Sequence, residues 1–255
     1  MAETLVPRTN VTGDFDGAWL LYRASLRHCW LPAALLALIW AGLLGLLMSR
    51  LHAQDDVYLL VSQSEELVSS AAFWRVVTAA CCISTLLFCM IIAIVHAVAI
   101  EIPIGLGTAF ARALRSFPGA LAAAAVYLVL TTLGTLLFVL PGAWLWGMWQ
   151  LWPVVLIVER TGPTMSFGRS WALMRGVWWS ATTLTSVVTV AAVSIPLVGN
   201  AVAATLAVIV GAGSLQVQYV ALCALGISAV FTAPLLPAAL VAVYVAQLRG
   251  RVSGV

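Results

Sequence analysis

The sequence predicts an all-α, polytopic membrane fold, and its composition is the first reason. Hydrophobic residues make up 63% of the 255 positions and charged residues only 8%, whereas about 25% of the residues in a soluble domain are charged. A water-soluble fold of this length could not bury so much apolar surface, so lipid is expected to cover most of it. No polar segment is long enough for a soluble catalytic domain. We therefore expect a single membrane domain over residues 1–255.

The distribution of arginine is the second reason, and it predicts an orientation. All twelve basic residues are arginine, and only Arg50 and Arg75 lie in segments expected on the outer side. The other ten lie in segments expected on the inner side: Arg8, Arg23, Arg27, Arg112, Arg115, Arg160, Arg169, Arg175, Arg249 and Arg251. Basic segments stay on the cytoplasmic side, so both termini are predicted to be cytoplasmic. This face suits anionic headgroups but is too sparsely charged for nucleic acid.

Six spans are expected from the apolar runs, because a helix needs about 20 apolar residues to cross a bilayer. The spans are residues 31–49, 76–100, 119–140, 141–158, 177–196 and 220–247. Only Leu140-Pro141-Gly142 joins the third span to the fourth, which predicts a tight hairpin with Pro141 at the first helical position. The first run begins too late in the chain for a cleavable signal peptide, so it is expected to stay as an anchor.

Two segments on the predicted outer side are longer than the other joints. Residues 51–74 combine acidic residues with an apolar helical face, which predicts a short amphipathic helix on the outer surface. Residues 197–218 contain an apolar stretch, 201–210, that is short for a span. We expect a re-entrant or surface helix there, because a further span would move the C-terminal arginines to the outer side.

A weak internal repeat divides the chain into three units, approximately residues 10–100, 101–158 and 159–249. Each unit begins with three residues spaced by four, which places them on one helical face. The motifs are Phe15-x-x-x-Trp19-x-x-x-Arg23, Gly107-x-x-x-Ala111-x-x-x-Arg115 and Phe167-x-x-x-Trp171-x-x-x-Arg175. Unless this recurrence is chance, each unit is predicted to be a cytoplasmic amphipathic helix followed by a two-span hairpin, with the units related by an axis along the membrane normal.

The sequence contains no recognised signature of catalysis or metal binding. No H-E-x-x-H, P-loop, G-x-S-x-G or S-x-x-K motif occurs, so no catalytic residue, metal or cofactor is predicted. Asp14 and Asp16 are interpreted as acceptors for the free N–H groups at a helix start, although the pair could suggest a weak cation site. The five cysteines lie in or beside apolar runs and are interpreted as buried small hydrophobic residues.

Three polar residues are candidates for a function within the membrane. His96 is the titratable side chain deepest inside a predicted span, and such a residue calls for a functional hypothesis. Glu101 and Glu159 close the second and fourth spans. His96 and Glu101 could face one cavity on the cytoplasmic side and carry protons or ions. The alternative is a neutral histidine that bonds to a neighbouring carbonyl.

The arginines that end the three repeat motifs are candidates for binding lipid phosphate. They are Arg23, Arg115 and Arg175. A ring of guanidinium groups near the inner headgroups could hold phosphate through paired hydrogen bonds. The arginines could instead pair with Glu101, Glu159 or helix-terminal carbonyls, or only set the orientation. Trp19 and Trp171 are predicted to anchor the amphipathic helices at the interface rather than to stack on a ligand.

The segment 140–176 resembles a known family. Its features are Pro141-Gly142-x-x-Leu145, Val155 to Glu159, Gly162-Pro163 and Ser170-Trp171-x-Leu173-x-Arg175-Gly176, with Tyr244-x-x-x-Leu248-Arg249 near the C-terminus. This pattern resembles the YciC-like group of bacterial six-span membrane proteins and the membrane domain fused to some glycerophosphodiester phosphodiesterases. The resemblance implies a six-span membrane scaffold. It does not imply phosphodiesterase activity, because the catalytic domain of those enzymes is not expected in this chain.

These features favour a non-enzymatic scaffold of the bacterial inner membrane that binds lipids or a partner in envelope upkeep. The alternative is a transporter or channel subunit for a small solute or ion, with a path lined by His96, Glu101 and Glu159. An intramembrane enzyme acting on lipid is supported least, since no nucleophile–base pair is evident. The expected partners are anionic lipids on the cytoplasmic side, and a membrane-protein partner or second copy held through small-residue faces such as 120–125.

Overall fold

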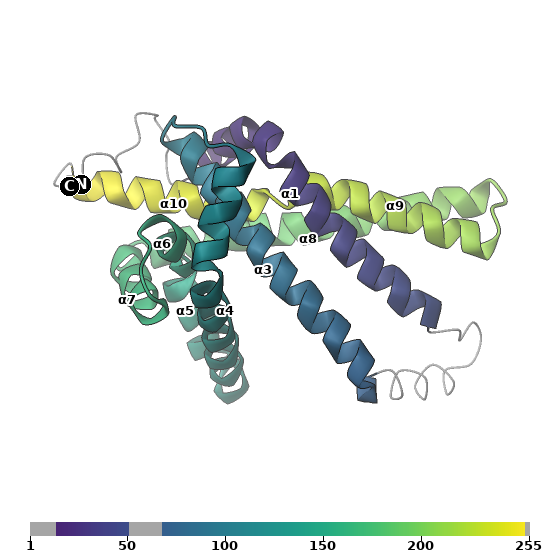
Figure 1. Cartoon of the computed structure of the whole chain (residues 1–255), viewed down its shortest axis with the longest axis horizontal. Coiled ribbons are helices and arrows are strands. Elements are labelled where there is room, and N and C mark those ends of the chain that lie inside the picture. The colour runs from purple at the N-terminus through teal and green to yellow at the C-terminus, as the bar shows by residue number, and fades with distance from the viewer. Residues whose placement is uncertain (1–13, 51–67, 253–255) are drawn as a thin grey trace.

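The computed structural model describes residues 14–50 and 68–252 (Figure 1). Within these ranges the chain is helical and contains no strand, so the all-α prediction is confirmed. The helices are α1 (Phe15–Arg50), α3 (Ala71–Ala99), α4 (Leu106–Leu137), α5 (Val139–Trp149), α6 (Trp152–Val158), α7 (Pro163–Met174), α8 (Trp178–Ile209), α9 (Ser214–Thr232) and α10 (Leu235–Val252). The amphipathic helix expected over 51–74 lies mostly outside the described residues.

Five of the described segments are long and apolar enough to cross a membrane. They are Phe15–Leu46, Ala71–Ala99, Leu106–Leu137, Trp178–Ile209 and, across α9 and α10, Gln216–Gly250. In the most apolar part of α8, only 6% of the residues are buried inside the molecule. Apolar surface on this scale is stable in lipid and not in water. The chain is therefore a helical membrane protein.

Two of the expected amphipathic helices are continuous with the spans that follow them. α1 contains the first motif and the first expected span, and α4 contains the second motif and the third span as far as Leu137. The expected boundaries fall near Pro32 and Pro118, which lie inside these helices. Proline has no N–H and crowds the preceding turn, so a helix can bend there. Figure 1 shows the purple start of α1 running in a different direction from its later turns.

The long helices pack in pairs, with α1 on α3, α4 on α5 and α8 on α9. Figure 1 shows these pairs extending from a shared region in different directions. A close backbone approach holds α4 against α5, because a Cβ added to Gly142 would lie 2.6 Å from the backbone nitrogen of Thr135. The turn between the two helices lies at Phe138, before the expected Leu140-Pro141-Gly142.

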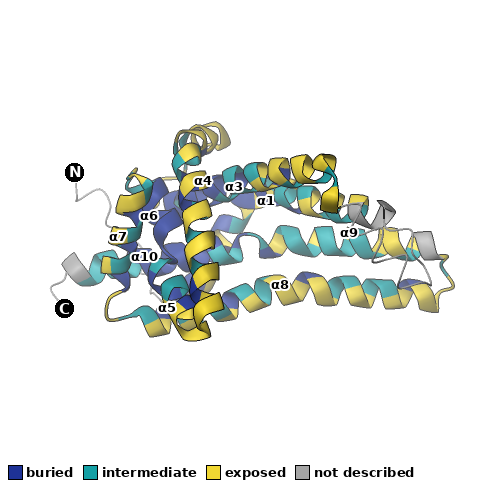
Figure 2. Cartoon of the chain, turned by 90° about the horizontal axis from the view of Figure 1, so that it is seen from below, coloured by how far each residue is buried: buried dark blue, intermediate teal, exposed yellow. Residues whose placement is uncertain are grey.

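Three consecutive runs of buried residues meet where the helix pairs converge. The runs are residues 89–97 of α3, 150–157 around α6 and 237–245 of α10. α3, α6 and α10 contact one another, and Figure 2 shows buried, dark-blue ribbon at α6 and along α10. A helix that is buried on every side, rather than along one stripe, lies in the interior of a protein. We call these three runs the central core.

The single helix expected over 141–158 is two shorter helices, α5 and α6. Pro153 is one cause, because it has no N–H to continue the ladder of α5 and its ring crowds the preceding turn. Ser170 of α7 is the other. Its buried hydroxyl donates to the carbonyl of Met148 (3.1 Å) and accepts from the N–H of Leu151 (3.2 Å). The break therefore leaves these two buried backbone groups paired.

A re-entrant or surface helix is expected over residues 197–218. In the structure these residues instead continue α8 and then turn into α9. That expectation is wrong because α8 passes through Pro196 without interruption. Leaving the helix there would expose backbone groups to lipid, where each unsatisfied group is costly. α9 supports the continuation, since a Cβ on Gly199 would meet Ser228 Oγ at 3.5 Å. The expected sixth span, 220–247, is divided between α9 and α10.

Replacing Ser170 by alanine tests the bridge between α7 and the break that separates α5 from α6. The change removes the hydroxyl partner of the Met148 carbonyl and the Leu151 N–H, so we expect the free energy of unfolding to fall by about 1–3 kcal/mol. Ser180→Ala is the matched control, because the exposed Ser180 hydroxyl bonds to the nearby Val177 carbonyl. Reversible unfolding in mixed detergent–SDS micelles measures both variants. Equal stability of the two would contradict the bridge.

Candidate functional site

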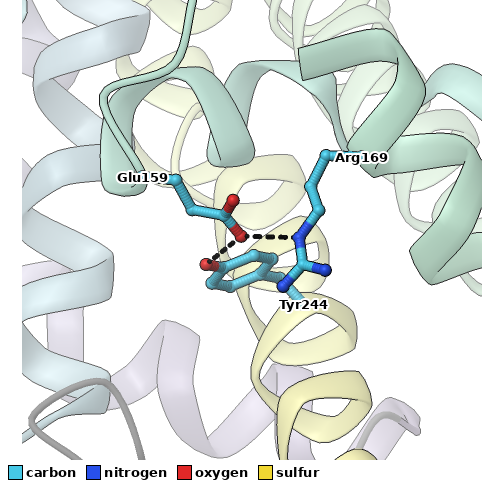
Figure 3. A network of polar contacts seen from close by, with 3 residues as sticks. All are labelled: Glu159, Arg169 and Tyr244. Atoms are coloured by element: carbon cyan, nitrogen blue, oxygen red, sulfur yellow. Dashed lines mark hydrogen bonds and ion pairs between the residues drawn. The ribbon is translucent and has the colours of Figure 1, made fainter. Parts of the chain in front are cut away.

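A polar cluster lies at the edge of the central core, where α6 ends (Figure 3). One carboxylate oxygen, Glu159 Oε1, accepts hydrogen bonds from the Tyr244 hydroxyl (3.0 Å) and from Arg169 Nε (3.1 Å). The three residues come from the end of α6, from α10 and from α7, so one carboxylate connects three elements. Of these residues only Glu159 is a candidate from the sequence, since packing of distant segments brings the other two to it.

The two bonds of this cluster differ in strength. The side chains of Glu159 and Arg169 are 18% and 37% exposed. An ion pair with this much contact with solvent contributes about 0–1 kcal/mol to stability. Tyr244 is completely buried, and a hydrogen bond from a buried hydroxyl to a charged group is worth about 1.5–3 kcal/mol. The Tyr244–Glu159 bond therefore contributes more than the ion pair, and it connects α10 to the end of α6.

His96 lies within the central core, packed against this cluster. Its side chain is 5% exposed, and its ring meets that of Tyr244 edge-on at a centroid distance of 6.3 Å. Its Nε2 atom has no hydrogen-bond partner among the described residues. Tyr244 therefore contacts both His96 and Glu159, which are two of the three polar candidates.

Glu101, the third polar candidate, has a different environment. It follows α3 in the left-handed conformation, with φ 57°, and it is exposed. Its N–H donates to the Val98 carbonyl (3.1 Å), and the N–H of Ile102 donates to the Ala97 carbonyl (3.0 Å). This is a common way of ending a helix. The structure therefore buries His96 and exposes Glu101 instead of placing both in one cavity.

A second site lies between α4 and the link that joins α6 to α7. It is a cavity of about 200 Å³ whose polar lining is Arg112, Arg115, Ser116, Arg160 and Thr161. We call it the arginine pocket. Arg115 is one of the predicted phosphate ligands. Arg112 was not among the predicted ligands. It lies three residues before Arg115, a spacing that keeps both on one helical face, and this is the signal in the sequence that could have found it.

The other two predicted phosphate ligands do not line the arginine pocket. Arg23 is exposed on α1. Arg175 is exposed and ends α7, where its N–H donates to the Trp171 carbonyl. The structure therefore combines one arginine of the repeat motifs with two that lie outside them.

Both predicted tryptophan anchors contact another aromatic ring. Trp19 stacks on Tyr22 at a centroid distance of 5.2 Å and is 46% exposed. Trp171 meets Trp144 of α5 edge-on at 4.7 Å. Trp19 thus keeps an aromatic surface that a membrane interface could cover, whereas Trp171 also packs α7 against α5.

The comparisons with known proteins add no family to these observations. No family model, curated protein or solved structure matches the chain. The resemblance to YciC-like proteins therefore stays a prediction. Among the described residues, no three His, Cys, Asp or Glu side chains are grouped closely enough to hold a metal ion. The support for a function comes from the polar cluster and the arginine pocket.

Proposed function

We propose that this chain is a non-enzymatic scaffold of the bacterial inner membrane that binds anionic lipids, alone or with a partner, in envelope upkeep. The arginine pocket is the observation that supports this function. Three arginines line one cavity, and within the described residues none of their guanidinium groups has a hydrogen bond or an ion pair. Positive charges in this arrangement repel one another unless an anion lies between them.

The surface beside the pocket favours a lipid over a soluble anion. α4 carries Arg112 and Arg115 and is also apolar enough to cross a membrane. On the same helix, Phe110 is 45% exposed and Leu114 is 52% exposed. A lipid could therefore place its phosphate among the arginines and its acyl chains along α4.

We propose that the chain crosses the membrane six times, as three hairpins, with both termini in the cytoplasm. α5 and α6 together would form the fourth span. The arginines favour a cytoplasmic location for the links before α4 and before α7. In this orientation the arginine pocket faces the cytoplasmic leaflet, which carries anionic headgroups.

Transport of a small solute or ion has weaker support. It requires a polar path lined by His96, and His96 is packed in the central core. The cavities beside α4, beside α5 and between α1 and α8 are lined by other residues. A scaffold explains a tightly packed core better than a transporter does.

Cysteine labelling tests the proposed orientation. Gly213 lies between α8 and α9, Gly105 lies before α4, and a Cβ at either position would meet no atom within 4 Å. We expect Gly213→Cys to react with a membrane-impermeant maleimide in intact cells, and Gly105→Cys only after permeabilisation. The unaltered chain gives the background from its own five cysteines. Labelling in the opposite order would contradict the orientation.

Lipid analysis of the purified protein tests the proposed function. Changing Arg112, Arg115 and Arg160 together to glutamine removes the three charges of the pocket. We expect the anionic lipid that the protein retains, measured by native mass spectrometry, to fall about tenfold or more, as removal of at least one charge-assisted hydrogen bond would cause.

A second triple variant controls for net charge. Arg23, Arg27 and Arg175 are exposed and lie outside the pocket, and their change to glutamine removes the same total charge. We expect this control to keep its anionic lipid. The proposed function fails if the pocket variant retains as much anionic lipid as the control.

A further inference from the structure

We propose that the arginine pocket selects a doubly charged phosphate group, such as a phosphate monoester, over the singly charged phosphodiester of most membrane lipids. This inference rests on the proposed function and names the ligand of the same site. Its basis is the charge, the backbone conformation and the unpaired hydroxyl that meet at the pocket.

The number of positive charges favours a doubly charged ligand. α4 supplies Arg112 and Arg115, and the link between α6 and α7 supplies Arg160. A phosphate monoester carries about −1.5 to −2 charges at neutral pH, whereas a phosphodiester carries one. Because Coulomb energy scales with the product of the charges, the same three arginines attract the monoester up to about twice as strongly.

Arg160 reaches the pocket through an uncommon backbone conformation. Its φ is 54°, in the left-handed region that residues other than glycine seldom adopt. The preceding residue, Glu159, bonds to Arg169 and Tyr244 in the polar cluster, while Arg160 lines the pocket. Glu101 has the same conformation after α3, so the turn itself belongs to the helix end. Arg160 differs in that the carboxylate of its neighbour, Glu159, bonds to Arg169 and Tyr244 and not to Arg160.

Hydrogen-bond donors beside the arginines complete the site. Thr161 Oγ1 is buried and has no hydrogen-bond partner among the described residues, and Ser116 also lines the cavity. The pocket extends to Gly162 and Pro163, where α7 begins without a side-chain cap, so the positive end of the helix dipole lies beside it. A buried hydroxyl without a partner is unfavourable, and rotation of the Thr161 side chain toward the cavity would let a phosphate oxygen satisfy it.

Two probes distinguish the possible sources of the phosphate group. The first is phosphatidate in phosphatidylcholine nanodiscs, compared with phosphatidylglycerol at equal mole fraction. The second is inorganic phosphate added to the full chain in detergent. We expect binding of phosphatidate to be about tenfold tighter than that of phosphatidylglycerol, the effect of roughly one additional charge-assisted hydrogen bond. Binding of inorganic phosphate alone would support the doubly charged site but assign it to a soluble ligand, contradicting the lipid function.

Two variants connect this preference to the pocket. Arg160→Gly removes the guanidinium and keeps the backbone, because glycine adopts a positive φ without strain. Thr161→Val removes the buried hydroxyl with little change in shape. We expect each variant to lose the preference for phosphatidate. Thr183→Val is the matched control, since the exposed Thr183 hydroxyl bonds to the Trp179 carbonyl of its own helix. Unfolding temperatures establish that each variant is folded.

Equal affinity for phosphatidate and phosphatidylglycerol would overturn the inference. So would a preference that survives both Arg160→Gly and Thr161→Val. If the protein retains anionic lipid without any preference, the proposed function stands and only the selection of a doubly charged phosphate is lost.

Discussion

The convergence of three completely buried helical runs is the constraint on which the rest of the structure depends. Within a bilayer the hydrophobic effect does not drive helices together, because lipid tails accommodate apolar side chains as well as a protein interior does. α3, α6 and α10 must therefore associate through close packing and a few polar contacts. Small residues such as Ala93, Ala239 and Ala242 permit the packing, and the Glu159 carboxylate supplies a polar contact with Tyr244.

The end of α6 connects this core to the arginine pocket. Glu159 bonds inward to α7 and α10, and the next residue, Arg160, lines the pocket. One turn of backbone therefore serves both the stability of the core and the charge of the pocket. The break before α6 contributes to the same arrangement. With Ser170 bridging that break, α6 takes a course separate from α5, and α7 packs against both.

Composition and the presence of long apolar runs were enough to predict a helical membrane protein, because they determine which surface lipid can cover. The length of an apolar run was a poor guide to helix ends. Pro153 separates two helices where Ser170 pairs the freed backbone groups, whereas Pro196 lies inside a continuous helix. The sequence did not predict the central core either, because helices that face lipid and helices that face protein are equally apolar. Arg112 was not predicted, although its helical spacing from Arg115 pointed to it, whereas Arg160 joins the pocket only after distant segments pack together.

A double-mutant cycle on Glu159 and Tyr244 is the most direct measurement of how α6 and α10 meet. Glu159→Met and Tyr244→Phe, singly and combined, are compared by the free energy of unfolding in mixed micelles. We predict a coupling energy of about 1–3 kcal/mol, the range for a hydrogen bond to a charged group. Tyr244→Phe combined with Arg175→Gln, which lies outside the cluster, should show additive effects. Additive effects for Glu159 and Tyr244 as well would contradict the convergence of α6 and α10 in the central core.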